Sequence, residues 1–295
     1  MEPSVHSPIF THQVVKAMRS LYPEELADRA WDNVGLLQEN INPASGTVPP
    51  RVLLTNDLTP RVAEEAIKKQ ASVIVSYHPF IFRGLKSITL SDPHQLVVLR
   101  LAQANIAVYS PHTAADAVLG GVNDWLAGIL RRLPGLASAP PIISVVQPTR
   151  GAPPPAGFEG AGYGRLAVLP APVELEAVLQ VYSAALGMRH IQVAQPRGFG
   201  GKVGSVAVCA GSGYSVLKDV EADLVLTGEV SHHDALRLTM LGRCVATVFH
   251  SNSERGFLRE VLRPQLEGVL REEVEGVEVV VSEEDKDPFE IWEAR

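Results

Sequence analysis

The sequence has few cysteines and no long apolar run. Its 295 residues include only two cysteines, Cys209 and Cys244. Two cysteines cannot build a disulfide framework or a zinc ribbon, and each lies in or beside an apolar run, which predicts buried free thiols. No stretch approaches the roughly 18 unbroken apolar residues that a membrane-spanning helix needs. The N-terminus also lacks the pattern of a secretory signal. We therefore expect an intracellular globular protein, cytoplasmic, with a nuclear location also open.

A surplus of basic residues is also missing. Lysine and arginine number 26 against 33 aspartates and glutamates, which gives a formal net charge of −7. Proteins that hold nucleic acid by neutralising its phosphates usually carry a basic surplus, so this class is disfavoured. The 46% of hydrophobic residues is enough for a packed core and argues against wholesale disorder.

Short apolar runs alternate with helix-like segments along the first half. The stretches "RVLLTND", "ASVIVSYHP" and "IAVYSPH" predict strands, and "TPRVAEEAIKKQ" and "DPHQLVVLRLAQAN" predict helices. Thr59 and Pro60 form the cap and first position of the earlier helix. The alternation resumes in the second half, and this spacing indicates an α/β fold with mixed, mostly parallel sheets.

The chain reads as two halves joined by an unusual stretch. Residues 132–162 are rich in proline, glycine and alanine and predict a long connection. Residues 1–131 then form a first α/β repeat and residues 163–295 a second. The stretches "AVYSPHTAADAVL" and "ATVFHSNSERGFL" echo each other, because both read as strand, histidine, three residues, carboxylate and helix. We interpret this echo as a divergent internal duplication.

The echo supplies candidate metal ligands. His112 and Asp116 form the first unit of the echo, His250 and Glu254 form the second, and His78 ends a third strand. Ligands of open α/β sheets bind beyond the carboxyl ends of the strands. Mixed nitrogen and oxygen donors suit Zn, Fe, Mn or Co, and carboxylates can bridge two ions. One or two divalent transition-metal ions are therefore expected.

A second interpretation of the same residues needs no metal. Thr113 with Asp116, and Ser251 with Glu254, match the capping box at the start of a helix. The two interpretations are compatible, because a carboxylate in the first helical turn can still face a cleft.

Two further stretches carry weaker signals. His232 and His233 are adjacent on a predicted helix and point about 100° apart, so they suit a substrate cleft better than one ion. Ser231 and Asp234 form another capping pattern there. Gly-Ser-Gly in "CAGSGYSVL" could cradle a phosphate, but it lacks the third glycine of a dinucleotide fingerprint and the lysine of a P-loop. Close backbone packing explains it at least as well.

Seven stretches of the chain carry a resemblance to a known family: "WDNVGLL", "SYHPFIFRGLKSI", "AVYSPHTAADAVLGGVNDWLA", "AVCAGSGYSVL", "ADLVLTGEVSHHDAL", "HSNSERGFL" and "SEEDKDP". Together they resemble the NIF-three-like family, whose members are often labelled homologues of GTP cyclohydrolase I type 2. The resemblance covers nearly the whole chain and is strongest to the eukaryotic branch. It implies two intertwined α/β repeats forming one compact protein, in which the C-terminal part completes the first repeat. It also implies a ring-shaped homohexamer, a trimer of dimers with metal sites facing an internal cavity.

The resemblance also implies a ligand set. The family holds its metal pair with a His-His doublet, an aspartate and a His-x-x-x-Glu unit, which correspond here to His78, Asp116, His250 and Glu254. The doublet reads Tyr77-His78 in this chain, so one imidazole is absent and a single metal, or a weaker second site, is expected. Five side chains are expected to support the ligands or contact substrate: Tyr77, His112, His232, His233 and Arg255.

The function implied is metal-dependent hydrolysis of a nucleotide or another phosphorylated small molecule. A bound metal would lower the pKa of a water molecule and polarise the substrate. The GTP cyclohydrolase label is weak support, since names spread through families more readily than activities do. The alternative is a non-enzymatic scaffold with a structural metal, which binds a transcriptional coregulator.

Overall fold

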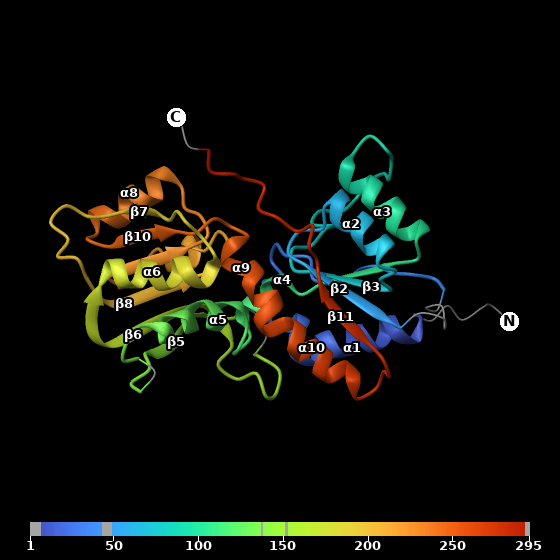
Figure 1. The fold of residues 1–295 in the computed structure, drawn as a ribbon, viewed down its shortest axis with the longest axis horizontal. Helices are drawn as coiled ribbons and strands as arrows, with labels where there is room; N and C mark the ends of the chain where they lie inside the picture. The colour runs from blue at the N-terminus through green and yellow to red at the C-terminus, as the bar shows by residue number, and fades with distance from the viewer. Residues whose placement is uncertain (1–6, 43–48, 137, 151–152, 293–295) are drawn as a thin grey trace. The chain divides into compact units, whose positions relative to one another are not determined.

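The computed structural model describes residues 7–42, 49–136, 138–150 and 153–292. Contacts group the chain into two compact units. The first unit comprises Met1–Ala115 and Leu258–Pro288, and the second comprises Asp116–Phe257 and Phe289–Arg295. The chain thus leaves the first unit, builds the second and returns. The predicted α/β fold is confirmed, since each unit contains one mixed sheet with helices packed against it (Figure 1).

The first unit is built on a five-stranded sheet in the order β1-β4-β3-β2-β11. Strand β1 is an antiparallel edge, and the other four strands run parallel. Every residue of β3 and β4 is buried, as continuous apolar runs in a covered parallel sheet predict. The strands are β1 (Gly35–Gln38), β2 (Arg51–Thr55), β3 (Val73–Ser76), β4 (Ala107–Ser110) and β11 (Glu278–Val281).

Helices cover both faces of this sheet. Helices α2 and α3 bury their apolar sides on Leu53, Ile74 and Val108, while α1 and α10 lie over the opposite face (Figure 1). The predicted start of α2 is confirmed, because the Thr59 hydroxyl accepts the Val62 amide at 3.4 Å and Pro60 follows. The helical elements are α1 (Ile9–Leu21), η1 (Glu24–Leu26), α2 (Pro60–Lys68), α3 (Pro93–Gln103), α4 (His112–Ala117, which ends in the second unit), η3 (Leu258–Leu262, a π-helix) and α10 (Arg263–Arg271).

The second unit is built on a six-stranded sheet in the order β5-β6-β8-β9-β10-β7. Strands β8, β9 and β10 are parallel, whereas β5, β6 and β7 pair antiparallel. Strand β5 lies inside the proline- and glycine-rich stretch 132–162. The strands are β5 (Ile142–Pro148), β6 (Gly162–Glu174), β7 (Gln192–Ala194), β8 (Lys202–Cys209), β9 (Leu224–Thr227) and β10 (Cys244–Thr247).

The helices of the second unit also enclose an apolar core. Leu217 of α7 and Leu238 of α8 pack against one face of the sheet, and α5 and α6 contact β6. Ser231 caps α8 by accepting the Asp234 amide at 3.3 Å, as predicted. The helical elements are α5 (Val122–Gly128), η2 (Ile129–Arg132), α6 (Leu175–Leu186), α7 (Tyr214–Leu217), α8 (His232–Met240) and α9 (Asn252–Phe257).

Both cysteines are buried and free, which confirms that prediction. Burial raises the pKa of each thiol, that of Cys244 to about 11, so neither is a reactive thiolate near neutral pH. Of the helices that the structure describes, none combines the length and apolarity needed to cross a membrane.

The two units share one arrangement that places the site residues. In each, three consecutive strands lie side by side and parallel: β2, β3 and β4 in the first unit, and β8, β9 and β10 in the second. Their carboxyl ends therefore meet along one edge of each sheet, where ligands of α/β proteins bind.

Candidate functional site

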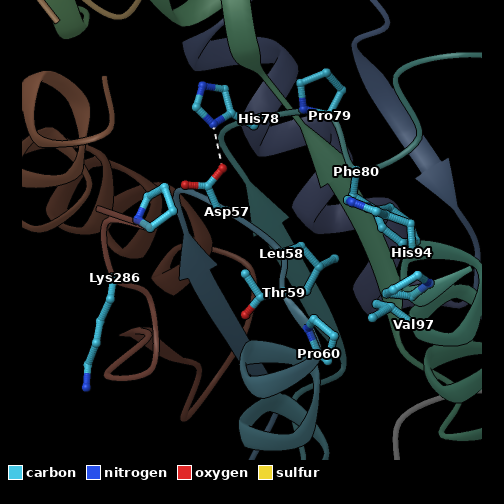
Figure 2. A pocket seen from close by; sticks show the side chains of 12 residues that line it. Asp57, Leu58, Thr59, Pro60, His78, Pro79, Phe80, His94, Val97 and Lys286 are labelled. Carbon is cyan, nitrogen blue, oxygen red and sulfur yellow. Dashed lines mark hydrogen bonds and ion pairs between the residues drawn. The ribbon is translucent and has the colours of Figure 1, made fainter. Parts of the chain in front are cut away.

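His78 lies just beyond β3 and is held by a carboxylate from the neighbouring strand. Its Nδ1 lies 2.9 Å from Oδ1 of Asp57, which follows β2 (Figure 2). Its backbone N–H donates to the Asn56 carbonyl at 3.0 Å, which fixes the loop that carries the ring. A carboxylate at Nδ1 keeps the proton there and makes Nε2 the nitrogen with the lone pair, as in metal-binding histidines.

His112 opens α4 and is held in the same way by a carboxylate. Its Nδ1 lies 2.6 Å from Oδ1 of Asp32. The Thr113 amide donates to Asp32 Oδ2 at 3.2 Å, and the Thr113 hydroxyl also donates to it. Burial alone would raise the pKa of Asp32, but the bonds from His112 and Thr113 and the charge of His112 outweigh it, so the pKa lies below its usual value. The pair is therefore a charge-assisted hydrogen bond.

Thr113 is not the helix cap that the sequence predicts. Helix α4 begins one residue earlier, at His112, whose φ of 31° lies in the left-handed region. The Thr113 hydroxyl accepts the Asp28 amide at 3.0 Å and donates to Asp32, so it ties a preceding loop to the helix instead. The Thr113 hydroxyl binds Asp32 rather than the helix backbone, because the Asp32 carboxylate lies close enough to bind both Thr113 and His112.

Tyr77 occupies the position of the absent doublet histidine. Its side chain is buried, and its ring lies edge-on to His78 at 5.2 Å and to His112 at 5.7 Å between centroids. The two histidine rings are themselves 5.4 Å apart. Tyr77 thus fills the space beside both imidazoles and fixes their positions by packing.

In the second unit, His250 lies between two glutamates. Its Nδ1 is 3.0 Å from Oε1 of Glu229, and its Nε2 is 3.4 Å from Oε1 of Glu254. Glu254 lies in the first turn of α9 and is only 2% exposed. The pKa of Glu229 lies below its usual value, chiefly because the Ser212 hydroxyl donates to its carboxylate. Burial acts in the opposite direction, and the hydrogen bond and charge of His250 lower the pKa further.

The glycines of "CAGSG" make room for these two ligands. A Cβ on Gly211 would lie 2.7 Å from Glu254 Oε1 and 3.0 Å from His250 Nε2, and the residue has a φ of 60°. The Gly211 amide donates to the Ser253 hydroxyl at 2.8 Å. Helix α7 beyond the loop has only four residues. Close packing therefore explains this motif better than a phosphate cradle does.

The remaining predicted residues have identifiable surroundings. The Asp116 carbonyl accepts from the Asn123 side chain at 3.0 Å. The Arg255 guanidinium donates to Asn252 at 3.0 Å and to the Ser251 hydroxyl at 2.8 Å, which holds it against the start of its own helix. His232 and His233 lie on the exposed first turn of α8 with their rings 5.3 Å apart.

A cavity of about 370 Å³ adjoins His78 in the first unit. Asp57 and His78 form part of its wall, and Lys286 comes from the segment after β11 (Figure 2). Most of the other lining side chains are apolar, Phe80 and Val97 among them. Ligand pockets commonly measure ~300–1,000 Å³ and combine apolar walls with a few polar groups, so this cavity suits a small molecule.

Each unit offers candidate metal ligands: His78 in the first, and His250 with Glu254 in the second. This set of nitrogen and oxygen donors suits a divalent transition metal. The three carboxylates that hold the histidine rings, Asp57, Asp32 and Glu229, were missed as partners by sequence reasoning. Their position in the sequence could have identified two of them, because Asp57 and Glu229 each stand two residues beyond a strand.

Comparisons with known proteins agree with this fold. A family model described as Duf34/NIF3 (NGG1p interacting factor 3) matches residues 10–288. The chain is 45% identical over 275 residues to Protein NIF3 homolog of Schizosaccharomyces pombe, covering 93% of this chain and 95% of that protein. It is 38% identical over 290 residues to NGG1-interacting factor 3 of Saccharomyces cerevisiae, covering 95% and 96%. A solved Bacillus cereus protein related to NIF3 has the same fold, with a TM-score of 0.80 at 22% identity over 97% of this chain and 100% of that one. The chain belongs to the Duf34/NIF3 family.

Proposed function

We propose that the protein is a metal-dependent hydrolase that acts on a nucleotide or another phosphorylated small molecule. One observation carries the proposal: three histidines at strand ends each have Nδ1 held by a carboxylate. Such a carboxylate orients the ring and makes Nε2 a better base or ligand. The pairs are His78 with Asp57, His112 with Asp32, and His250 with Glu229.

The proposed ligands are His78, Asp116, His250 and Glu254. Glu254 supports the assignment, because its carboxylate lies beside an imidazole nitrogen, with Oε1 3.4 Å from His250 Nε2. Zn, Fe, Mn or Co fits this donor set. When bound, the metal would supply Lewis acidity for hydrolysis.

The protein's own residues would bind substrate and move protons. His112, fixed by Asp32, is the proposed proton-transfer group at Nε2, since its ring is oriented without being a metal ligand. The cavity beside His78 gives a small substrate room. Lys286 on its wall is exposed, and among the described residues it has no ion pair, so it can contact an anionic group.

The test combines metal analysis with a hydrolysis screen. Purified protein is assayed on a panel of nucleotides and sugar phosphates with and without added metal. His112→Gln is expected to lower kcat by roughly 10²–10⁴-fold with unchanged metal content, because it removes proton transfer alone. His12→Gln changes an exposed histidine of α1 and serves as the matched control. A fully metal-loaded protein that hydrolyses nothing on the panel contradicts the proposal.

A second candidate is a partner-binding scaffold, and one observation favours it. The Saccharomyces cerevisiae relative is named for interaction with NGG1. On this proposal the protein reaches both cytoplasm and nucleus, forms a homohexamer and uses its metal structurally. Sedimentation gives the oligomeric mass. Coregulator binding that survives His112→Gln, without any hydrolysis, would favour the scaffold over the enzyme.

A further inference from the structure

Two large aromatic side chains lie exposed beside His112. Trp31 is 53% exposed and Phe82 is 43% exposed, and their ring centroids are 6.0 Å apart at an interplanar angle of 50°. The His112 ring lies 5.7 Å from Trp31 and 6.5 Å from Phe82. Trp31 and Phe82 are called the aromatic platform below. Neither the fold core nor the proposed ligand set uses them.

Hydrogen bonds hold the loops that carry the aromatic platform. Trp31 is followed by Asp32, which binds His112, and then by Asn33. The Asn33 side chain donates to the Ile81 carbonyl, one residue before Phe82. These two bonds fix the loops that present the rings. Grouped exposed aromatic side chains beside an oriented histidine mark a binding surface, since scattered single ones are the ordinary case.

Charge beside the platform indicates what kind of ring would bind. Arg83 and Lys86 follow Phe82 in the same exposed segment. Among the described residues, neither has an ion pair or a side-chain hydrogen bond. A surface that pairs aromatic faces with unpaired cations suits a planar heterocycle that carries phosphate. The net charge of −7 argues against a polymer of such units, which would need a wider basic surface.

We propose that the aromatic platform stacks the base of a mononucleotide, with the phosphate near Arg83 and Lys86. This inference rests on the proposed function and names its substrate class. Because the His78 and His112 rings are 5.4 Å apart, a base on the platform would place the rest of the molecule next to both histidines. Trp31 and Phe82 are therefore binding residues for the base.

Tryptophan fluorescence tests the inference directly. The chain has three tryptophans, Trp31, Trp125 and Trp292. In a variant that carries Trp125→Phe and Trp292→Phe, Trp31 is the sole reporter. GMP and AMP are expected to quench it saturably, and ribose 5-phosphate, which has no base, is expected not to. Equilibrium dialysis of labelled GMP with otherwise wild-type protein gives the same answer if that double variant folds poorly.

Alanine variants then assign the contact. Trp31→Ala and Phe82→Ala should each weaken GMP binding by roughly 5- to 150-fold, the range for loss of one base-stacking contact, with metal content unchanged. Leu90→Ala removes another exposed apolar side chain, 72% exposed, from the same segment and should leave binding unchanged. Arg83→Glu should weaken GMP more than it weakens guanosine.

The outcomes separate this inference from the proposed function. Hydrolysis that continues with no effect of the platform variants on GMP binding would overturn the platform alone. Base stacking without any hydrolysis would support the platform and count against the hydrolase. Tighter binding of single-stranded oligonucleotides than of GMP, or a change of sedimenting mass in Trp31→Ala, would overturn the inference in favour of a strand or a protein interface.

Discussion

The ends of β2, β3 and β4 differ from the ends of β8, β9 and β10 in a way that assigns different tasks to the two units. The ladders place Thr55 beside Ser76 in the first unit and Cys209 beside Thr227 in the second. Two residues beyond the first member of each pair stand Asp57 and Gly211. The first unit therefore has a carboxylate that holds a histidine ring where the second has a glycine.

The difference between Asp57 and Gly211 changes which groups can lie beside the strand ends of each unit. Asp57 and His78 face a cavity, and the exposed aromatic platform lies nearby around His112. Gly211 instead lets His250 and the buried Glu254 approach the backbone closely. Under the proposed function, the first unit supplies the open cavity for substrate, and the more tightly packed second unit supplies most of the proposed metal ligands.

The histidines before the two helices are also not strictly equivalent. His112 and Phe249 each stand two residues after a strand end, and both have left-handed backbones, with φ of 31° and 61°. His250 follows one residue later than its counterpart. The sequence echo aligns the two histidines, whereas the backbone aligns His112 with Phe249. This offset gives His250 a different approach to its helix.

The largest effect is expected from filling the close contact in the second unit. Gly211→Ala should abolish metal retention and cost about 1–3 kcal/mol, since its Cβ would lie 2.7 Å from Glu254 Oε1 at a φ of 60°. Gly187→Ala is the matched control, with a φ of 66° and no atom within 4 Å. Thermal unfolding should show that both variants are destabilised. Metal analysis should show that only Gly211→Ala has lost metal. Equal metal content in the two would remove the contrast between the units.

Replacing the buried Glu254 should distinguish its proposed role as a metal ligand from its role at the start of its helix. Glu254→Ala is expected to abolish metal retention and to cost about 0.5–2 kcal/mol as a lost interaction at the helix start. Glu254→Gln keeps the shape and removes the charge, so it should also lose metal while unfolding closer to wild type. Metal content is measured after dialysis. If Glu254→Ala retains its full metal content, Glu254 is not a metal ligand.

The third effect changes stability without changing metal content, and it concerns the segment that carries Lys286 to the cavity wall. Glu65 accepts the Glu283 amide at 3.0 Å and the Glu284 amide at 3.3 Å, and also binds Lys69 and Ser282. Burial would raise the pKa of Glu65, but these bonds outweigh it and hold the pKa below its usual 4.5. Glu65→Gln should lower the free energy of unfolding at neutral pH by about 1–3 kcal/mol.

The pH dependence of that difference follows from the direction of the shift. A depressed carboxyl pKa stabilises the folded state above the unfolded pKa, and the contribution disappears as pH falls through the folded pKa. The gap between wild type and Glu65→Gln in urea unfolding should therefore be full near pH 7 and shrink below about pH 4.5. A gap that stays constant to pH 3 would mean that ionised Glu65 does not hold the segment.

Local patterns predicted much of the fold. The buried runs of β3 and β4, the Thr59 and Ser231 caps, and the strand-end placement of the histidines all follow from periodicity and capping chemistry. Strand β5 is harder to foresee, because prolines surround "IISVVQ" and only its pairing with β6 makes it a strand. Thr113 was assigned as a cap because the competing Asp32 is 81 residues away in sequence.

The ring-holding carboxylates escaped prediction for a related reason. Asp32 and His112 are 80 residues apart, and Glu229 and His250 are 21 apart. Each pair is created by strand pairing and loop packing, which a linear pattern does not encode. The ligand set itself came from resemblance to a family, and it stays a prediction until metal is measured.

The path of the chain has a consequence for synthesis. Strand β11 pairs with β2 across more than two hundred residues, so the first sheet cannot be completed until nearly the whole chain has been made. A nascent chain that has emerged up to residue 257 holds most of the second unit but leaves one edge of β2 unpaired. Open strand edges invite association with other chains, and non-local pairing slows folding. The ribosome-bound protein therefore passes through a stage in which the edge of β2 needs protection, and truncation before residue 278 would make that stage permanent.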